Sequence, residues 1–173
     1  MPVQSAGPDI ISGAPGAARR TVLLTGASGV VGHALLQRLC DLDVVCLVHR
    51  SPVSGPNVTT ALGDIAKPRL GLAEQAYGEL AAKVDAVIHC AAITDFNRAD
   101  GSLETTNVTG TQNVAAFAAA ANAVLYHIST AFVHTKVDGG RGHTAIGYAS
   151  SKRAAEEVVQ SSGAPHVILR PPA

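Results

Sequence analysis

The sequence has few aromatic residues and no excess of charge of either sign. It contains no Trp, three Tyr and three Phe in 173 residues, so aromatic residues make up 3%. Its core must then be built from Val, Ala, Leu and Ile, which suits a buried parallel sheet covered by helices. Thirteen basic and thirteen acidic residues cancel, so no basic field predicts nucleic acid or an anionic membrane as a partner.

Cysteine is also scarce. Cys40, Cys46 and Cys90 form no Cys-x-x-Cys pair and have apolar neighbours, which predicts buried free thiols and a cytoplasmic protein. The seven histidines form no His-x-x-x-His pair, so we expect no metal site. No apolar run approaches the ~20 residues needed to span a bilayer. Residues 1–18 are rich in Gly, Pro, Ala and Ser without a signal-peptide pattern, and we expect a disordered lead.

Apolar strand-like runs alternate with longer helical patterns over residues 19–173. The predicted strands are Thr21–Thr25, Asp43–Val48, Val58–Leu62, Ala86–Cys90, Val124–Ile128 and His166–Leu169. The predicted helices are Val31–Leu39, Leu72–Ala82, Leu103–Ala120 and Tyr148–Gln160. This alternation predicts one α/β domain of Rossmann type, with three α/β/α layers and a doubly wound parallel sheet of order 3-2-1-4-5-6. Ligands of such sheets bind at the carboxyl ends of the strands.

A glycine-rich turn follows the first predicted strand. The residues are Thr-Gly-Ala-Ser-Gly-Val-Val-Gly at positions 25–32, and a helical pattern follows them. Glycines let the backbone turn tightly and approach a ligand, and the N–H groups at a helix start favour negative charge. The turn therefore predicts a phosphate site.

A second glycine-rich segment, Thr135–Gly147, holds four glycines. Glycine raises the entropy of a flexible backbone and leaves little side chain to pack, so we expect a mobile loop there. It is either a loop on the substrate side or a plain surface connection.

Tyr148 and Lys152 lie four residues apart, so they project from one face of a helix. A phenol has a reference pKa of ~10 and is a poor acid near neutral pH. The ammonium of Lys152 favours the phenolate, so we expect it to lower the pKa of Tyr148. The pair is therefore suited to proton transfer.

Ser129 and Thr130 follow directly after the fifth predicted strand, at its carboxyl end. A hydroxyl in that position can bind a substrate carbonyl and stabilise a developing oxyanion. The alternative is a strand end whose hydroxyl groups bond local backbone.

Taken together, these elements resemble the extended short-chain dehydrogenase/reductase family. The shared motifs are Gly26-x-x-Gly29-x-x-Gly32, Gly63-Asp64, His89-Cys90-Ala91-Ala92, Asn107-Val108-x-Gly110-Thr111, Ser129-Thr130, Tyr148-x-x-x-Lys152 and Arg170-Pro171. Residues 128–134 and 147–152 look most like the thioester and fatty-acyl reductase branch. The resemblance implies an NAD(P)-dependent oxidoreductase that transfers a hydride to a carbonyl or thioester.

The resemblance also implies roles for individual residues. Tyr148 would be the general acid, Lys152 would lower its pKa and bind the nicotinamide ribose, and Thr130 rather than Ser129 would bind the substrate oxygen. Asn107 matches a helix Asn whose part is either structural or catalytic. The cofactor would be bound by Gly26, Ser28, Gly29, Val30, Val31, Gly32, Arg50, Asp64, Ile65, Ala91, Ala92 and Lys152, with Asp64 at the adenine.

Arg50 indicates which dinucleotide to expect. An acidic residue at the end of the second strand would bind the ribose 2′-OH of NAD, but residues 47–51 read Leu-Val-His-Arg-Ser. The fork of a guanidinium suits a 2′-phosphate. We therefore expect NADP(H), with NAD(H) as the alternative.

In the family, Arg-Pro after the sixth strand is followed by chain that builds most of the substrate pocket. No such region lies within residues 19–173, so we expect a homodimer or a partner chain to complete the pocket. Two other functions stay open. One is an NAD(P)-dependent sugar-nucleotide epimerase or dehydratase, and the other is a non-catalytic NADP-binding regulatory module.

The variant Arg50→Ala tests the choice of cofactor. Loss of the guanidinium should weaken NADPH binding by about 10- to 100-fold, the range for one charged hydrogen-bonding partner, and leave NADH binding unchanged. Fluorescence titration with both nucleotides measures the two affinities. An unchanged ratio between them would rule out the role given to Arg50.

Overall fold

In the computed structural model, residues 19–95, 101–134 and 143–172 are described, with the backbone alone for 143–146. Six parallel strands form one sheet of order β3-β2-β1-β4-β5-β6, which confirms the predicted doubly wound topology. The strands are β1 (Thr21–Thr25), β2 (Asp43–Val48), β3 (Val58–Leu62), β4 (Ala86–His89), β5 (Val124–Ile128) and β6 (His166–Leu169).

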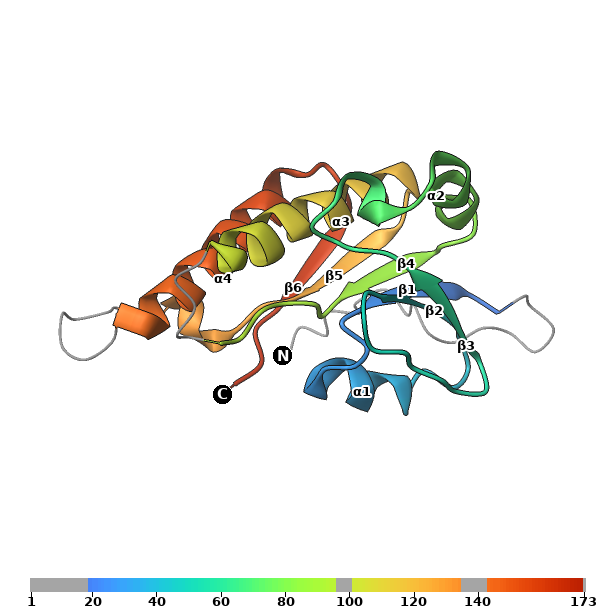
Figure 1. Cartoon of the computed structure of the whole chain (residues 1–173), viewed down its shortest axis with the longest axis horizontal. Coiled ribbons are helices and arrows are strands. Elements are labelled where there is room, and N and C mark those ends of the chain that lie inside the picture. Colours follow the sequence, from blue (N-terminus) through green and yellow to red (C-terminus); the bar gives the residue numbers. More distant parts are fainter. Residues whose placement is uncertain (1–18, 96–100, 135–142, 173) are drawn as a thin grey trace, which may run out of the picture.

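Helices cover both faces of the sheet. They are α1 (Val30–Leu36), α2 (Glu74–Ala81), α3 (Gly110–Ala120) and α4 (His143–Ser161). Figure 1 shows α1 on one face and α2, α3 and α4 on the other. The sheet grows in one direction from β1 to β3 and in the opposite direction from β4 to β6. Because the crossovers are right-handed, helices of the two halves cover opposite faces.

The core divides between the two faces of the sheet. Leu23 of β1 packs into the larger cluster with Val87 and Leu125, under Phe117 of α3. Its neighbour Leu24 belongs to the cluster beneath α1. Successive side chains of a strand point to opposite faces, so an uninterrupted apolar run is what a strand buried on both sides requires.

Helix α4 begins at His143, five residues before the predicted start. The predicted loop Thr135–Gly147 is therefore wrong over its last five residues, while 135–142 lie outside the described residues. Gly147 is tolerated inside this 19-residue helix, because tertiary packing overrides a propensity cost of about 1 kcal/mol.

Helix α1 ends at Leu36, three residues before the predicted end. Both Arg38 and Leu39 donate their backbone N–H to the carbonyl of Leu35, so the chain tightens and leaves the helix. Cys40 consequently lies in the turn and is exposed, contrary to the predicted burial, whereas Cys46 is buried and Cys90 half-buried.

The predicted helix Leu103–Ala120 is not uniform. Residues Glu104–Thr109 form a π-helical turn, and α3 proper starts at Gly110. A π-helical turn holds one residue more than an α-helical turn and is frequent at functional sites.

Candidate functional site

The glycine-rich turn after β1 lies against the segment that follows β4. Gly26 has a φ of +72°, and a Cβ at this residue would lie 2.5 Å from the backbone nitrogen of Ala91. A Cβ at Gly32 would overlap the carbonyl oxygen of Gly26. No side chain caps the start of α1 at Gly29. Only glycine permits this approach, and the turn it produces fits the pyrophosphate of a dinucleotide.

A cleft of about 560 Å³ opens at the carboxyl ends of β1 to β4. This volume is in the range of small-molecule sites. The predicted cofactor residues that line it are Gly26, Ser28, Gly29, Arg50, Asp64, Ile65, Ala91 and Ala92. Gly32 is buried behind the turn, and Val30 and Val31 are exposed beside it, so these three are not part of the lining.

The loop after β3 holds Asp64 in place. Its carboxylate accepts a hydrogen bond from the N–H of Ala66 at 2.9 Å, and its own N–H donates to the carbonyl of Leu70 at 2.8 Å. Arg69 and Leu70 both have positive φ values, 52° and 57°, which non-glycine residues rarely adopt. Leu70 is fully buried, so packing maintains the strained turn and hence the cleft wall.

Thr130, Tyr148 and Lys152 form a second, buried cluster. Their exposed fractions are 7%, 8% and 2%. Thr130 follows β5, and Tyr148 and Lys152 lie one turn apart on α4, as the spacing predicts. The three side chains do not line the cleft, but Lys152 interacts electrostatically with Cys90, which does.

Burial raises the pKa of Tyr148, while a hydrogen bond with Thr130 lowers it. The lowering that we expect from Lys152 stays a prediction. Lys152 Nζ donates to the carbonyl oxygen of Ile128 at 2.8 Å and lies 3.4 Å from Nε2 of His127. Burial lowers the pKa of Lys152 to about 8, opposed by the charges of Glu156 and Cys90.

Two buried histidines, His89 of the His-Cys-Ala-Ala motif and His127 of β5, lie beneath this cluster, and the sequence assigned a role to neither. Their rings are 5.3 Å apart between centroids. His89 has Thr25 Oγ1 2.7 Å from Nδ1 and Thr111 Oγ1 3.0 Å from Nε2. Burial lowers the pKa of His127 to about 3, helped by the charge of Lys152, and lowers that of His89 as well. Both imidazoles are therefore neutral at physiological pH.

Asn107 in the π-helical turn connects the cleft with α4. Its side-chain oxygen accepts from the N–H of Ile93 at 2.8 Å. Its amide nitrogen donates to the carbonyl of Ile93 and to the hydroxyl of Ser151, both at 3.0 Å. These contacts give Asn107 a structural role, because they connect Ile93, which lines the cleft, with Ser151, which precedes Lys152.

Glu156 lies one turn beyond Lys152 on α4 and is also buried. Arg170 donates to its carboxylate through two nitrogens, at 2.9 and 2.7 Å. Burial opposes ionisation of Glu156, but Arg170 and the Ser129 hydroxyl outweigh it and lower the pKa of the carboxyl. Ser129 thus acts on Glu156 and Thr130 acts on Tyr148, although Ser129 Oγ is buried and has no hydrogen-bond partner among the described residues.

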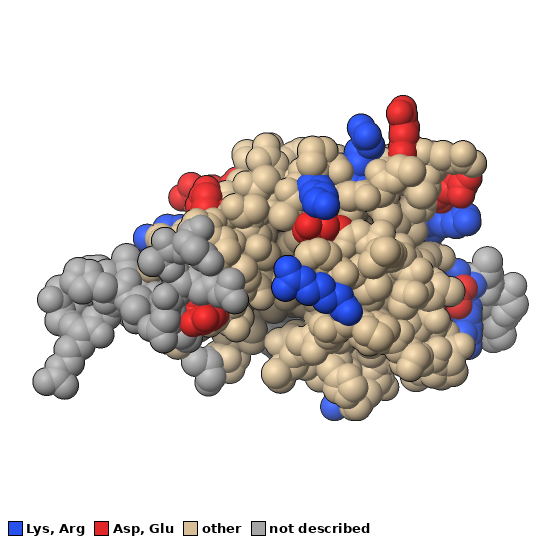
Figure 2. Space-filling view, viewed as in Figure 1, with Lys and Arg blue, Asp and Glu red and all other residues tan. Residues whose placement is uncertain are grey.

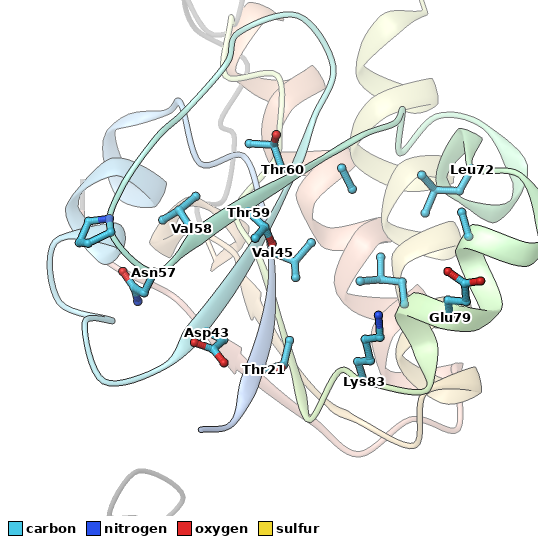
Figure 3. A pocket seen from close by; sticks show the side chains of 14 residues that line it. Thr21, Asp43, Val45, Asn57, Val58, Thr59, Thr60, Leu72, Glu79 and Lys83 are labelled. Atoms are coloured by element: carbon cyan, nitrogen blue, oxygen red, sulfur yellow. The ribbon is translucent and has the colours of Figure 1, made fainter. Parts of the chain in front are cut away.

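A larger hollow, about 760 Å³, lies between α2 and the strands β2 and β3 (Figure 3). Thr21, Asp43 and Val58 line it, and these are the first residues of their strands. It thus lies toward the amino ends of the strands, away from the cleft. Doubly wound sheets bind their ligands at the opposite ends, so the smaller cleft is the candidate site.

Acidic and basic side chains are interspersed over the face of the molecule shown in Figure 2. Over the described residues, no group of three or more His, Cys, Asp or Glu side chains could hold a metal ion. Within the same residues, none of the helices combines the length and the hydropathy that a bilayer crossing requires.

The sheet order, the glycine turn and the cleft define a dinucleotide-binding α/β domain of the Rossmann class. A family model described as "Male sterility protein", an NAD-binding family, matches residues 53–173. The chain belongs to this family of extended short-chain dehydrogenases/reductases.

Individual relatives agree with this assignment. The chain is 33% identical over 180 residues to the polyketide synthase-nonribosomal peptide synthetase ffsA of Aspergillus flavipes, covering 88% of this chain and 4% of that protein. The terminal R domain of the myxalamid PKS-NRPS pathway has a TM-score of 0.77 and 30% identity, over 91% of this chain and 50% of that one. The Bordetella bronchiseptica enzyme WbmH, solved with NAD⁺, has a TM-score of 0.68 and 25% identity, over 88% and 56%. The chain thus spans about half the length of these solved structures.

The close approach at Gly32 can be tested against Gly29 as a matched control. In Gly32→Ala the new Cβ would meet backbone atoms of Gly26 and Ala27, whereas in Gly29→Ala the nearest atom is 3.3 Å away. Gly32→Ala should lower the free energy of unfolding by about 1–3 kcal/mol. Urea denaturation measures it, and an equal loss in both variants would contradict the packing described.

The buried histidines predict acid lability. Their folded pKa values lie below the unfolded value of about 6.5, so the unfolded state binds more protons below that pH. The stability is present above pH 6.5 and is lost as the pH falls toward about 3, with a slope of about 1.4 kcal/mol per pH unit for each histidine. His127→Gln removes one of these titrations. Its urea unfolding between pH 7 and 4 should therefore show a shallower dependence than the wild type, and identical slopes would refute the assignment.

Proposed function

We propose that this chain is an NADP(H)-dependent reductase domain that transfers a hydride to the carbonyl carbon of a thioester or aldehyde. The observation that carries the proposal is the buried cluster of Thr130, Tyr148 and Lys152 beside a cleft with a dinucleotide turn. The close contacts of Gly26 and Gly32 fit a pyrophosphate, since they leave room there for backbone alone.

The nicotinamide supplies the hydride when it is bound. Tyr148 and Thr130 hold the substrate oxygen by hydrogen bonds, and the effect of Thr130 on the pKa of Tyr148 supports a position of both hydroxyl groups near one point. Tyr148 then gives its proton to the oxygen as charge develops. For a thioester, addition of the hydride and this proton gives a thiohemiacetal. Its C–S bond then breaks and the hydroxyl proton passes to the sulfur, so the products are an aldehyde and a free thiol. The catalytic hydroxyl is proposed to be that of Thr130, because Thr130 rather than Ser129 acts on the pKa of Tyr148.

NADP(H) is proposed over NAD(H) because Arg50 and His49 line the cleft after β2, with no carboxylate in that segment. The ribose 2′-phosphate carries negative charge, which the guanidinium of Arg50 complements. Asp64, at the end of β3, is proposed to contact the adenine. Residues Val30 and Val31 are proposed to contact the nucleotide from the rim of the turn.

The substrate is proposed to be a carrier-bound thioester, since two of the relatives above belong to polyketide synthase-nonribosomal peptide synthetase systems. A further region, supplied by more chain or by a second copy, is proposed to complete the substrate pocket.

The variant Tyr148→Phe tests the proposal, with Tyr126→Phe on β5 as the matched control. Tyr148→Phe should keep its NADPH affinity and lose about 10²- to 10⁴-fold in turnover, the usual contribution of a positioned acid. NADPH fluorescence reports binding, and NADPH consumption with acyl thioesters and aldehydes reports turnover.

Three outcomes would contradict the proposal. NADPH binding without turnover, unaffected by Tyr148→Phe, would indicate a regulatory module. Release of an epimerised or dehydrated sugar nucleotide would indicate the epimerase or dehydratase alternative. Equal turnover of Tyr148→Phe and Tyr126→Phe would exclude Tyr148 as the acid.

A further inference from the structure

The ammonium of Lys152 is buried at the carboxyl end of β5, where two successive residues of that strand receive it. Ile128 offers its backbone carbonyl at 2.8 Å, and His127 offers Nε2 at 3.4 Å. An ammonium carries only donors, so both partners must act as acceptors. His127 therefore presents a lone pair at Nε2 and carries its proton on Nδ1.

This tautomer leaves a polar atom without a partner. Nδ1 of His127 is buried and has no hydrogen-bond partner among the described residues. Burying an unpaired N–H destabilises a fold, and most buried polar groups are paired for that reason. His89, by contrast, has a threonine hydroxyl at each ring nitrogen. Among the described residues, the side chain of His127 therefore has Lys152 as its one hydrogen-bond partner.

We propose that His127 is a positioning residue, a neutral acceptor that fixes the ammonium of Lys152 at the end of β5 in the orientation that the reaction needs. The proposal deepens the proposed function, because Lys152 has a part in hydride transfer only if that function holds. His127 itself touches neither substrate nor cofactor in this assignment.

The surroundings of Lys152 make a neutral acceptor necessary. Its charge interacts with Glu156 on α4, with His89 on β4, with Cys90 directly after β4 and with His127 on β5. Glu156 is already engaged by Arg170 through two hydrogen bonds. Because burial holds the pKa of His127 near 3, its ring adds no positive charge beside Lys152 at neutral pH.

A histidine that merely fills the core would give different results from a positioning histidine. The side-chain amide of Gln reaches about as far as Nε2, so His127→Gln keeps an acceptor for Lys152. The amide of Asn reaches only as far as Nδ1, so His127→Asn keeps polarity and loses that acceptor. His127→Phe keeps the ring shape and loses both nitrogens.

The readout is the titration of Lys152 itself, measured without cofactor or substrate. The sequence holds four lysines, Lys67, Lys83, Lys136 and Lys152, so lysine-labelled protein gives four resolvable side-chain signals in NMR. Lys152→Arg assigns the signal. In the wild type the pKa should be about 8, and His127→Gln should stay close to it. His127→Asn and His127→Phe should lower it by about one unit, a tenfold easier loss of the proton.

His166→Phe on the exposed edge of β6 is the control and should leave the titration unchanged. A wild-type pKa in both His127→Asn and His127→Phe would overturn the proposal, as would an equal fall in His127→Gln. If His127→Phe fails to fold, the comparison of Asn with Gln decides alone. Absence of turnover in a chain that shows the expected pKa pattern would overturn the proposed function and leave the placement of Lys152 standing.

Discussion

The contact between the turn after β1 and the backbone after β4 is the constraint on which the rest of the site depends. Gly26 lies against Ala91 so closely that no side chain fits between them. This contact joins the two halves of the sheet where the direction of the connections reverses, and the cleft opens directly beside it. The turn shapes the nucleotide site and also fixes the strand end that leads to Ile93 and Asn107.

From Asn107 the same set of contacts reaches α4. Asn107 bonds Ile93 on one side and Ser151 on the other, and Ser151 is flanked by residues of the Tyr148–Lys152 turn. The positions of the cleft and of the buried cluster are therefore coupled through one amide side chain. The two buried charges on α4 are paired as well. Lys152 donates to the carbonyl of Ile128 at the end of β5, and the carboxylate of Glu156 accepts from Arg170, which follows β6.

Much of this architecture could be predicted from the sequence. Strands buried on both faces produce apolar runs such as Val22–Leu24, and a parallel order follows from the helices between them. The placement of Tyr148 and Lys152 on one helix and of Thr130 after a strand could be predicted too, because both are local features, whereas their catalytic roles stay predictions. The start of α4 at His143 and the partners of Lys152 could not be predicted, because they depend on contacts distant in sequence. The exposure of Cys40 has a local cause instead, the end of α1 at Leu36.

The π-helical turn at Glu104–Thr109 has a consequence for how this helix is compared with others. One extra residue in a helical turn shifts the phase of everything before it by about 100°, the rotation per residue of an α-helix. The faces of residues before Glu104 and after Thr109 therefore follow two different phases, and a single helical wheel drawn through both misplaces one of them. A gap-free alignment with a relative that has an ordinary α-helix here would shift Asn107 off the face that reaches Ser151.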